Sequence, residues 1–137
     1  VLYRKEDVVQ RVKDITNGEG CAVVYDSVGK DTFDKSLDCL RRRGVLVSFG
    51  QSSGPVDPVP PVLLSRKGSL YLTRPTLFDY TATRKELEAA AADLFAVVEA
   101  GKVKIEVNQR FPLSEAAEAH RALEARETTG STILTAR

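Results

Sequence analysis

The sequence predicts an α/β fold: the C-terminal part of a doubly wound parallel sheet, followed by a helix-rich segment. Two runs, Cys21–Asp26 and Val45 to Gly50, are apolar almost without interruption, as in parallel strands that are covered on both faces. A helical pattern precedes each run, so helices and strands alternate as they do in a doubly wound sheet. The opening residues, Val1 to Tyr3, resemble the tail of an earlier strand.

Two helices are predicted in the first part of the chain. Glu6 to Thr16 carries apolar residues at helical spacing, and Asn17-Gly18 is a typical stop signal. Asp31 to Arg43 is the second predicted helix, and Gly44 follows its end. The run Arg41-Arg42-Arg43 then falls in the last turn, where cations complement the helix dipole.

A domain boundary is expected near Pro75. Four prolines between Gly54 and Pro61 predict a loop, because proline cannot occupy a central strand or a helix interior. The run from Ser69 to Thr73 is predicted as the last strand of the sheet, and therefore as an edge strand. We assign residues 1–75 to the sheet domain and residues 76–137 to a segment that packs elsewhere.

The second segment begins with a strong helix signal. Thr83 and Glu86 form a capping box ahead of an alanine-rich helix that ends at Gly101. The rest of the segment is predicted to hold a half-exposed strand, a second helix capped by Ser114, and a short final strand, at Val103 to Val107, Ser114 to Arg126 and Ser131 to Thr135.

Composition excludes several classes of function. The net charge of +1, from 20 basic and 19 acidic residues, predicts neither nucleic-acid binding nor attraction to an anionic membrane. Apolar runs stay well short of the roughly 20 residues that a membrane-spanning helix needs. Cys21, Cys39 and the single histidine, His120, lack metal-ligand spacing, so no metal site is expected. Buried free thiols suit a reducing cytoplasm.

Two polar turns follow the predicted strands. One is Asp26-Ser27-Val28-Gly29, and the other runs from Phe49 through Gly50 and Gln51 to Gly54. Ligands of an open parallel sheet collect outside the carboxyl ends of its strands, and glycine allows a ligand to approach the backbone closely. The turns therefore predict a nucleotide or cofactor site, although tight connections without a ligand would show the same residues.

Longer motifs give a resemblance to a known family. The motifs are Val24 to Gly29, Ser36 to Leu40, Arg43-Gly44, Ser48 to Gly50, Lys67 to Tyr71, Thr73 to Pro75 and Leu123 to Arg126. They span nearly the whole chain in order, and together they resemble the zinc-free quinone oxidoreductases of the medium-chain dehydrogenase/reductase superfamily. The resemblance implies a reductase that uses NADPH to reduce quinones or related electrophilic carbonyls. It also implies a Rossmann-type domain followed by a return to a chaperonin-10-like catalytic domain.

The resemblance also implies roles for individual residues. Tyr3 matches a tyrosine beside the adenosine 2′-phosphate, and Arg126 matches an arginine that reaches NADPH from the catalytic side. The turn residues Ser27 and Val28 match the adenosine half of the cofactor site, and Phe49, Gly50 and Gln51 match its nicotinamide end. Sheet packing of Tyr3, core packing of Phe49 and a solvated Arg126 remain alternatives. None of the residues in hand is assigned a catalytic role.

The resembled family forms homodimers through an edge strand, which implies a dimer through Ser69 to Thr73. A strand edge blunted by Arg74 and Pro75 is the alternative.

The chain lacks a Gly-x-Gly-x-x-Gly turn and contains no methionine, so we expect it to be the C-terminal part of a longer enzyme. The chain alone is then expected to be inactive and to bind NADPH no more tightly than millimolar, because the pyrophosphate has lost its helix N-terminus. A nucleotide-binding or dimerisation module without catalysis is the alternative function. A methyltransferase-like domain fits less well, because the strands lead into Asp-Ser-Val-Gly and Phe-Gly rather than into acidic ribose-binding ends, and because the later segment fits a returning catalytic domain.

Overall fold

A computed structural model describes residues 5–136 of the chain. The chain forms two compact units, which divide between Tyr80 and Thr81. Tyr3 lies outside the described residues. This division rests on compactness alone. The assignment of residues 1–75 and 76–137 to two functional domains therefore stays a prediction.

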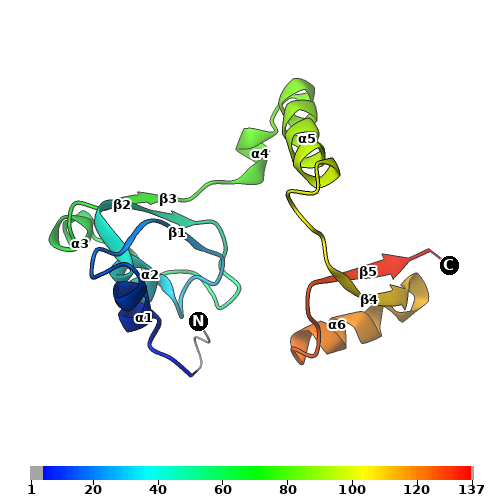
Figure 1. The fold of residues 1–137 in the computed structure, drawn as a ribbon, viewed down its shortest axis with the longest axis horizontal. Coiled ribbons are helices and arrows are strands. Elements are labelled where there is room, and N and C mark those ends of the chain that lie inside the picture. The colour runs from blue at the N-terminus through cyan, green and yellow to red at the C-terminus, as the bar shows by residue number, and fades with distance from the viewer. Residues whose placement is uncertain (1–4, 137) are drawn as a thin grey trace. The chain divides into compact units, whose positions relative to one another are not determined.

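The first unit is a three-stranded parallel sheet with helices in the connections (Figure 1). The strand order is β1-β2-β3, so β3 lies at an edge, as the sequence predicted. This arrangement confirms the α/β fold class with a parallel sheet. The elements are α1 (Val8–Ile15), β1 (Cys21–Asp26), α2 (Phe33–Asp38), β2 (Leu40–Ser48), α3 (Pro61–Arg66), β3 (Tyr71–Thr73) and α4 (Leu77–Tyr80).

The core lies on one face of this sheet. Val24, Leu46 and Leu72 are register partners across the three strands, so their side chains share a face. They belong to an apolar cluster with Phe33 and Leu37 of α2, and Leu46 and Leu37 are almost completely buried. Burial of this row fixes the strand register, because a shift by one residue would turn every side chain of a strand to the other face.

The opposite face corrects one expectation. Val23 and Tyr25 of β1 and Tyr71 of β3 are 41%, 71% and 61% exposed. The prediction that β1 is covered on both faces is therefore wrong for the residues that the structure describes. A continuous apolar run predicts burial only if elements cover both faces, and among the described residues of this unit the core cluster forms on one face.

The second predicted helix is shorter than expected. α2 ends at Asp38, Cys39 is its C-cap, and β2 begins at Leu40. The β1–β2 register passes from Cys21↔Leu40 to Val23↔Val45, so the intervening residues of β2 form a bulge. The placement of Arg41, Arg42 and Arg43 in the last turn of a helix is therefore wrong.

Contacts distant in sequence account for this bulge. A Cβ atom on Gly20 would lie 2.8 Å from the Cys39 carbonyl oxygen, so the two segments touch through their backbones. Arg43 has a φ of 59° and donates its backbone N–H to the Gly68 carbonyl at 2.9 Å. These tertiary contacts hold the arginines in a bulge, although their intrinsic helix propensity is high.

The second unit combines helices with a two-stranded parallel sheet. Thr83 and Glu86 form the predicted capping box at the start of α5 (Arg84–Glu99), and β5 (Ser131–Thr135) has the predicted bounds. The remaining elements are β4 (Val107–Pro112), a 3₁₀ turn η1 (Leu113–Glu115) and α6 (Ala116–Glu124). The strand predicted from Val103 starts only at Val107, where pairing with β5 begins. Ser114 lies within η1 and does not cap α6 with its side chain.

Candidate functional site

Two turns at the carboxyl edge of the sheet are joined into one surface. The backbone N–H groups of Phe49 and Gly50 donate to the Asp26 carbonyl at 2.9 and 3.2 Å. Ser53 donates its N–H and its hydroxyl to the Val28 carbonyl at 2.8 and 2.7 Å. The turn after β1 therefore lies directly against the turn after β2, as expected for the ends of neighbouring parallel strands.

Two glycines permit this close approach. A Cβ atom on Gly50 would lie 2.2 Å from the carbonyl oxygen of Ser27, far inside a van der Waals contact. Gly29 has a φ of 88°, and a Cβ atom there would lie 2.8 Å from the Gly54 carbonyl oxygen. Both glycines are thus needed for the two turns to pack against each other.

The carboxylate of Asp26 organises the first turn. Asp26 is 4% exposed, and its Oδ1 accepts the backbone N–H groups of Val28 at 2.8 Å and Gly29 at 3.0 Å. The Thr32 hydroxyl lies 2.9 and 2.8 Å from the two carboxylate oxygens, and the Ser36 hydroxyl donates to Oδ2 at 2.8 Å. The participation of Thr32 and Ser36 in this network was not predicted from the sequence. Their spacing of four residues, from the N-cap Thr32 into α2, is the signal that could have found them.

These hydrogen bonds set the charge of Asp26. Burial by itself raises the pKa of a carboxyl group, because it disfavours the charged form. The donors from Gly29, Ser36, Val28 and Thr32 outweigh burial, and the pKa of Asp26 is lowered from its ordinary value of 3.8. Asp26 is therefore a buried carboxylate with a full set of donors, which suits a structural anion better than a general base.

The side chains around this edge are available to a ligand. Ser27 and Gln51 are exposed and Val28 is partly buried, while the Phe49 ring is 50% exposed. Phe49 does not belong to the buried core of the described residues, and its contact with a cofactor stays a prediction. The structure thus brings five predicted site residues to one surface: Ser27, Val28, Phe49, Gly50 and Gln51.

Arg126 belongs to the second unit. It follows α6, is exposed, and has a φ of 62° in the turn where its N–H donates to the Leu123 carbonyl at 3.1 Å. Its proposed approach to the cofactor therefore stays a prediction.

Metal ligands do not gather in the described part of the chain. No group of three or more His, Cys, Asp or Glu residues there could hold an ion. Cys21 donates its N–H to the Cys39 carbonyl at 2.8 Å, and both thiols are free. Burial, together with nearby Cys21 and Asp38, raises the pKa of the Cys39 thiol, which opposes formation of a thiolate ligand. Residues 5–136 also contain no helix long and apolar enough to cross a membrane.

Comparison with known proteins agrees with this geometry, because the similar sequences and structures include quinone oxidoreductases. A quinone oxidoreductase of Pseudomonas aeruginosa is 58% identical over 132 residues, which cover 96% of this chain and 41% of that protein. Quinone oxidoreductase 1 of Escherichia coli is 52% identical, over 98% of this chain and 42% of that protein. The crystal structure of Escherichia coli quinone oxidoreductase complexed with NADPH superposes with a TM-score of 0.90 and 51% identity, over 98% of this chain and 42% of that one.

The chain spans about two fifths of the length of these relatives. A family model described as "zinc-binding dehydrogenase" matches residues 1–134. The resemblance to quinone oxidoreductases is confirmed, and the chain belongs to the zinc-binding dehydrogenase family within the medium-chain dehydrogenase/reductase superfamily.

Proposed function

We propose that the chain forms part of an NADPH-dependent oxidoreductase that reduces quinones or related electrophilic carbonyls. The joined turns at the carboxyl edge of the sheet carry this proposal, because they form a polar, glycine-containing surface where such a sheet binds nucleotides. The relatives named quinone oxidoreductases support the reaction class, and the neighbour solved with NADPH supports the cofactor.

The contribution of this chain is position rather than acid–base chemistry. Bound NADPH supplies the hydride, and the protein orients the cofactor and its acceptor. The Ser27 hydroxyl and the Gln51 amide offer hydrogen-bonding groups, and the exposed face of Phe49 offers an apolar wall. In this proposal Ser27 and Val28 border the adenosine half, whereas Phe49, Gly50 and Gln51 border the nicotinamide.

Two further contacts complete the proposed cofactor site. Tyr3 would lie beside the adenosine 2′-phosphate, and Arg126 would reach the cofactor from the second unit. The fully charged guanidinium of arginine is well suited to a phosphate.

A homodimer through β3 is the associated proposal. β3 pairs with β2 on one side only within the described sheet, which leaves the other side open to a second copy. The 61% exposure of Tyr71 also leaves an aromatic ring on that strand for an interface. The free, buried thiol of Cys39 fits a reducing cytoplasm, where we place the protein.

The decisive experiment is quinone-dependent oxidation of NADPH by the full-length protein, with NADH as the comparison. Gln51→Ala removes one exposed amide at the edge and is expected to raise the KM for the cofactor about 2- to 12-fold, as expected for one hydrogen bond. Gln10→Ala, on the exposed side of α1, is the matched control. An unchanged cofactor KM in Gln51→Ala would remove Gln51 from the site, and absence of NADPH oxidation with any quinone would refute the function.

A further inference from the structure

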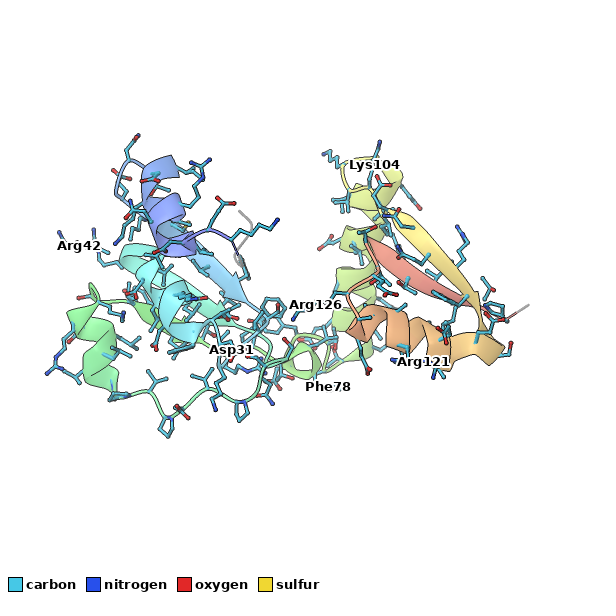
Figure 2. The ribbon with its side chains drawn as sticks, turned by 90° about the horizontal axis from the view of Figure 1, so that it is seen from below. Asp31, Arg42, Phe78, Lys104, Arg121 and Arg126 are labelled. Carbon is cyan, nitrogen blue, oxygen red and sulfur yellow. The ribbon has the colours of Figure 1, made fainter. Side chains whose placement is uncertain are left out.

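The amino end of the sheet carries a group of arginines that the proposed function does not use. Arg41, Arg42 and Arg43, here called the bulge arginines, follow the first residue of β2, which pairs with the first residue of β1. Asp31 follows β1 at the other end, and Figure 2 labels Asp31 and Arg42 at these opposite ends. The bulge arginines therefore lie away from the turns of the candidate cofactor site.

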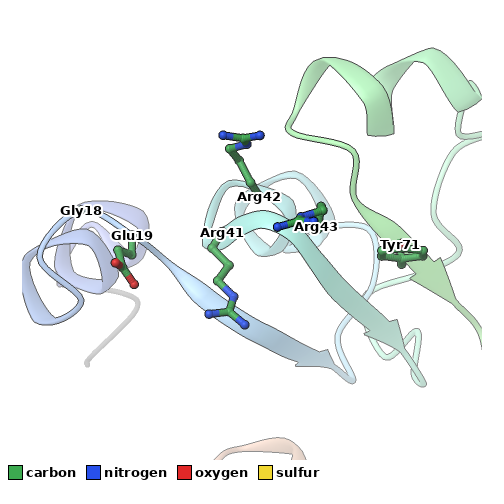
Figure 3. Close-up of a pocket in the computed structure, with 6 residues that line it drawn as sticks. All are labelled: Gly18, Glu19, Arg41, Arg42, Arg43 and Tyr71. Atoms are coloured by element: carbon green, nitrogen blue, oxygen red, sulfur yellow. The ribbon is translucent and has the colours of Figure 1, made fainter.

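A hollow accompanies the bulge arginines. It has a volume of about 810 Å³ and is lined by Gly18, Glu19, Arg41, Arg42, Arg43 and Tyr71 (Figure 3). The hollow is largely open to solvent. All three arginines are exposed, and none takes part in the three ion pairs found among residues 5–136. Glu19 is the one acidic residue among those that line the hollow.

The backbone that presents these side chains is held in place. Arg43 keeps a left-handed φ of 59° and donates its N–H to Gly68 at 2.9 Å. A Cβ atom on Gly44 would lie 2.9 Å from the Arg41 carbonyl oxygen, and one on Gly68 would lie 3.3 Å from Cγ of Arg42. A left-handed conformation is costly for arginine and persists only where the surroundings impose it. Bulges commonly re-aim side chains next to binding sites.

The arrangement indicates the class of ligand. Guanidinium groups bind phosphate oxygens in pairs of parallel hydrogen bonds. Figure 3 shows the side chains of Arg41 and Arg42 leaving the bulge in opposite directions, so a ligand that engages both must be extended. A nucleic acid fits less well, because Glu19 lines the same hollow and the chain as a whole carries a net charge of only +1.

We propose that this hollow binds a small anion with two or more linked phosphate groups, separately from the cofactor edge. Such an anion would neutralise at least two of the bulge arginines.

Calorimetric titration of the full-length protein, saturated with NADPH, with inorganic pyrophosphate and tripolyphosphate tests the proposal. Binding is expected to weaken about 10-fold in Arg42→Ala, because one charge-assisted contact is lost. Binding is expected to strengthen a few-fold in Glu19→Gln, because a repelling charge is removed. Arg66→Ala, an exposed arginine on α3, is the matched control and is expected to bind like the parent.

Three outcomes would overturn the proposal: no detectable binding of tripolyphosphate, equal binding by Arg42→Ala and the parent, or tighter binding of a single-stranded oligonucleotide than of tripolyphosphate. The cofactor KM of Arg42→Ala provides the second readout. An unchanged KM together with weakened tripolyphosphate binding identifies a separate site. A parallel change in both would show that the bulge arginines act on the cofactor edge, and the proposal of a separate site would fail.

Discussion

Asp26→Asn is the sharpest test of how the candidate site is held together. The substitution preserves size and keeps one oxygen for the N–H groups of Val28 and Gly29, which lie 2.8 and 3.0 Å from Oδ1. It replaces the other oxygen by an NH₂ group, which must face the hydroxyls of Thr32 and Ser36. Those hydroxyls can rotate to accept, so the network can persist without its charge.

The expected loss of stability in Asp26→Asn follows from the number of groups that donate hydrogen bonds to the carboxylate. Four groups donate to this carboxylate, and each bond weakens by about 0.5 to 1 kcal/mol when the acceptor loses its charge. The Asn side chain is easier to bury than a carboxylate, which offsets part of this loss. We therefore expect Asp26→Asn to lower the free energy of unfolding by about 2 kcal/mol at neutral pH. Asp26→Ala is expected to cost about 4 kcal/mol, because it leaves two amide donors buried without their acceptor.

The pH dependence supplies an independent check. Because the pKa of Asp26 is lower in the folded than in the unfolded chain, its ionisation stabilises the fold above the unfolded pKa. That stabilisation is lost as the pH falls through the still lower folded pKa. The difference in the free energy of unfolding between the parent and Asp26→Asn should therefore be largest at neutral pH. It should shrink as the pH falls below about 4.

Urea unfolding followed by circular dichroism at several pH values measures both quantities. Asp31→Asn is the matched control, because Asp31 is exposed and lies close by in the same connection. Equal unfolding free energies for the parent and Asp26→Asn at neutral pH, or a difference that does not change on acidification, would refute the role assigned to the carboxylate.

Three other predictions follow from local geometry. Gly50→Ala should separate the two turns, because its Cβ would lie 2.2 Å from the Ser27 carbonyl oxygen, and it should both destabilise the fold and raise the cofactor KM; a variant with parental values would contradict the packing. Thr83→Ala removes the side-chain cap of α5 and should cost about 1 kcal/mol in thermal or urea unfolding. Thr73→Lys places like charges on β3 of both copies and should shift the proposed dimer toward monomer in analytical ultracentrifugation, whereas Gln10→Lys should not; two dimeric variants would argue against an interface at β3.

Local signals were enough to predict some elements. The capping box at Thr83 and Glu86 defines the start of α5 through contacts within four residues, and the residues themselves encode it. The alternation of helices and apolar runs likewise predicted the parallel sheet of the first unit. These features depend on residues that are close together in the sequence.

Other features depend on contacts distant in sequence. The bulge arginines have good helix propensity, yet Gly20 and Gly68 hold their backbone in β2. The exposure of Tyr25 could not be predicted either, because it depends on which elements cover that face of the sheet. At the candidate site, the sequence indicated two turns. The packing of Gly50 against Ser27 could not be predicted, because it depends on how the two turns meet in the folded chain.

At the candidate site, Asp26 makes both local contacts and contacts with residues distant in sequence. Its carboxylate accepts backbone N–H groups of the turn after β1. Its backbone carbonyl accepts the N–H groups of Phe49 and Gly50 in the turn after β2. Asp26→Asn should therefore both lower the free energy of unfolding and weaken cofactor binding. Gln51 is exposed and lies at the rim, so its replacement should weaken cofactor binding while stability stays unchanged. Measuring both quantities for both variants separates a residue that shapes the surface from one that touches the ligand. If Gln51→Ala also destabilised the fold, its effect on the KM could no longer be attributed to contact with NADPH.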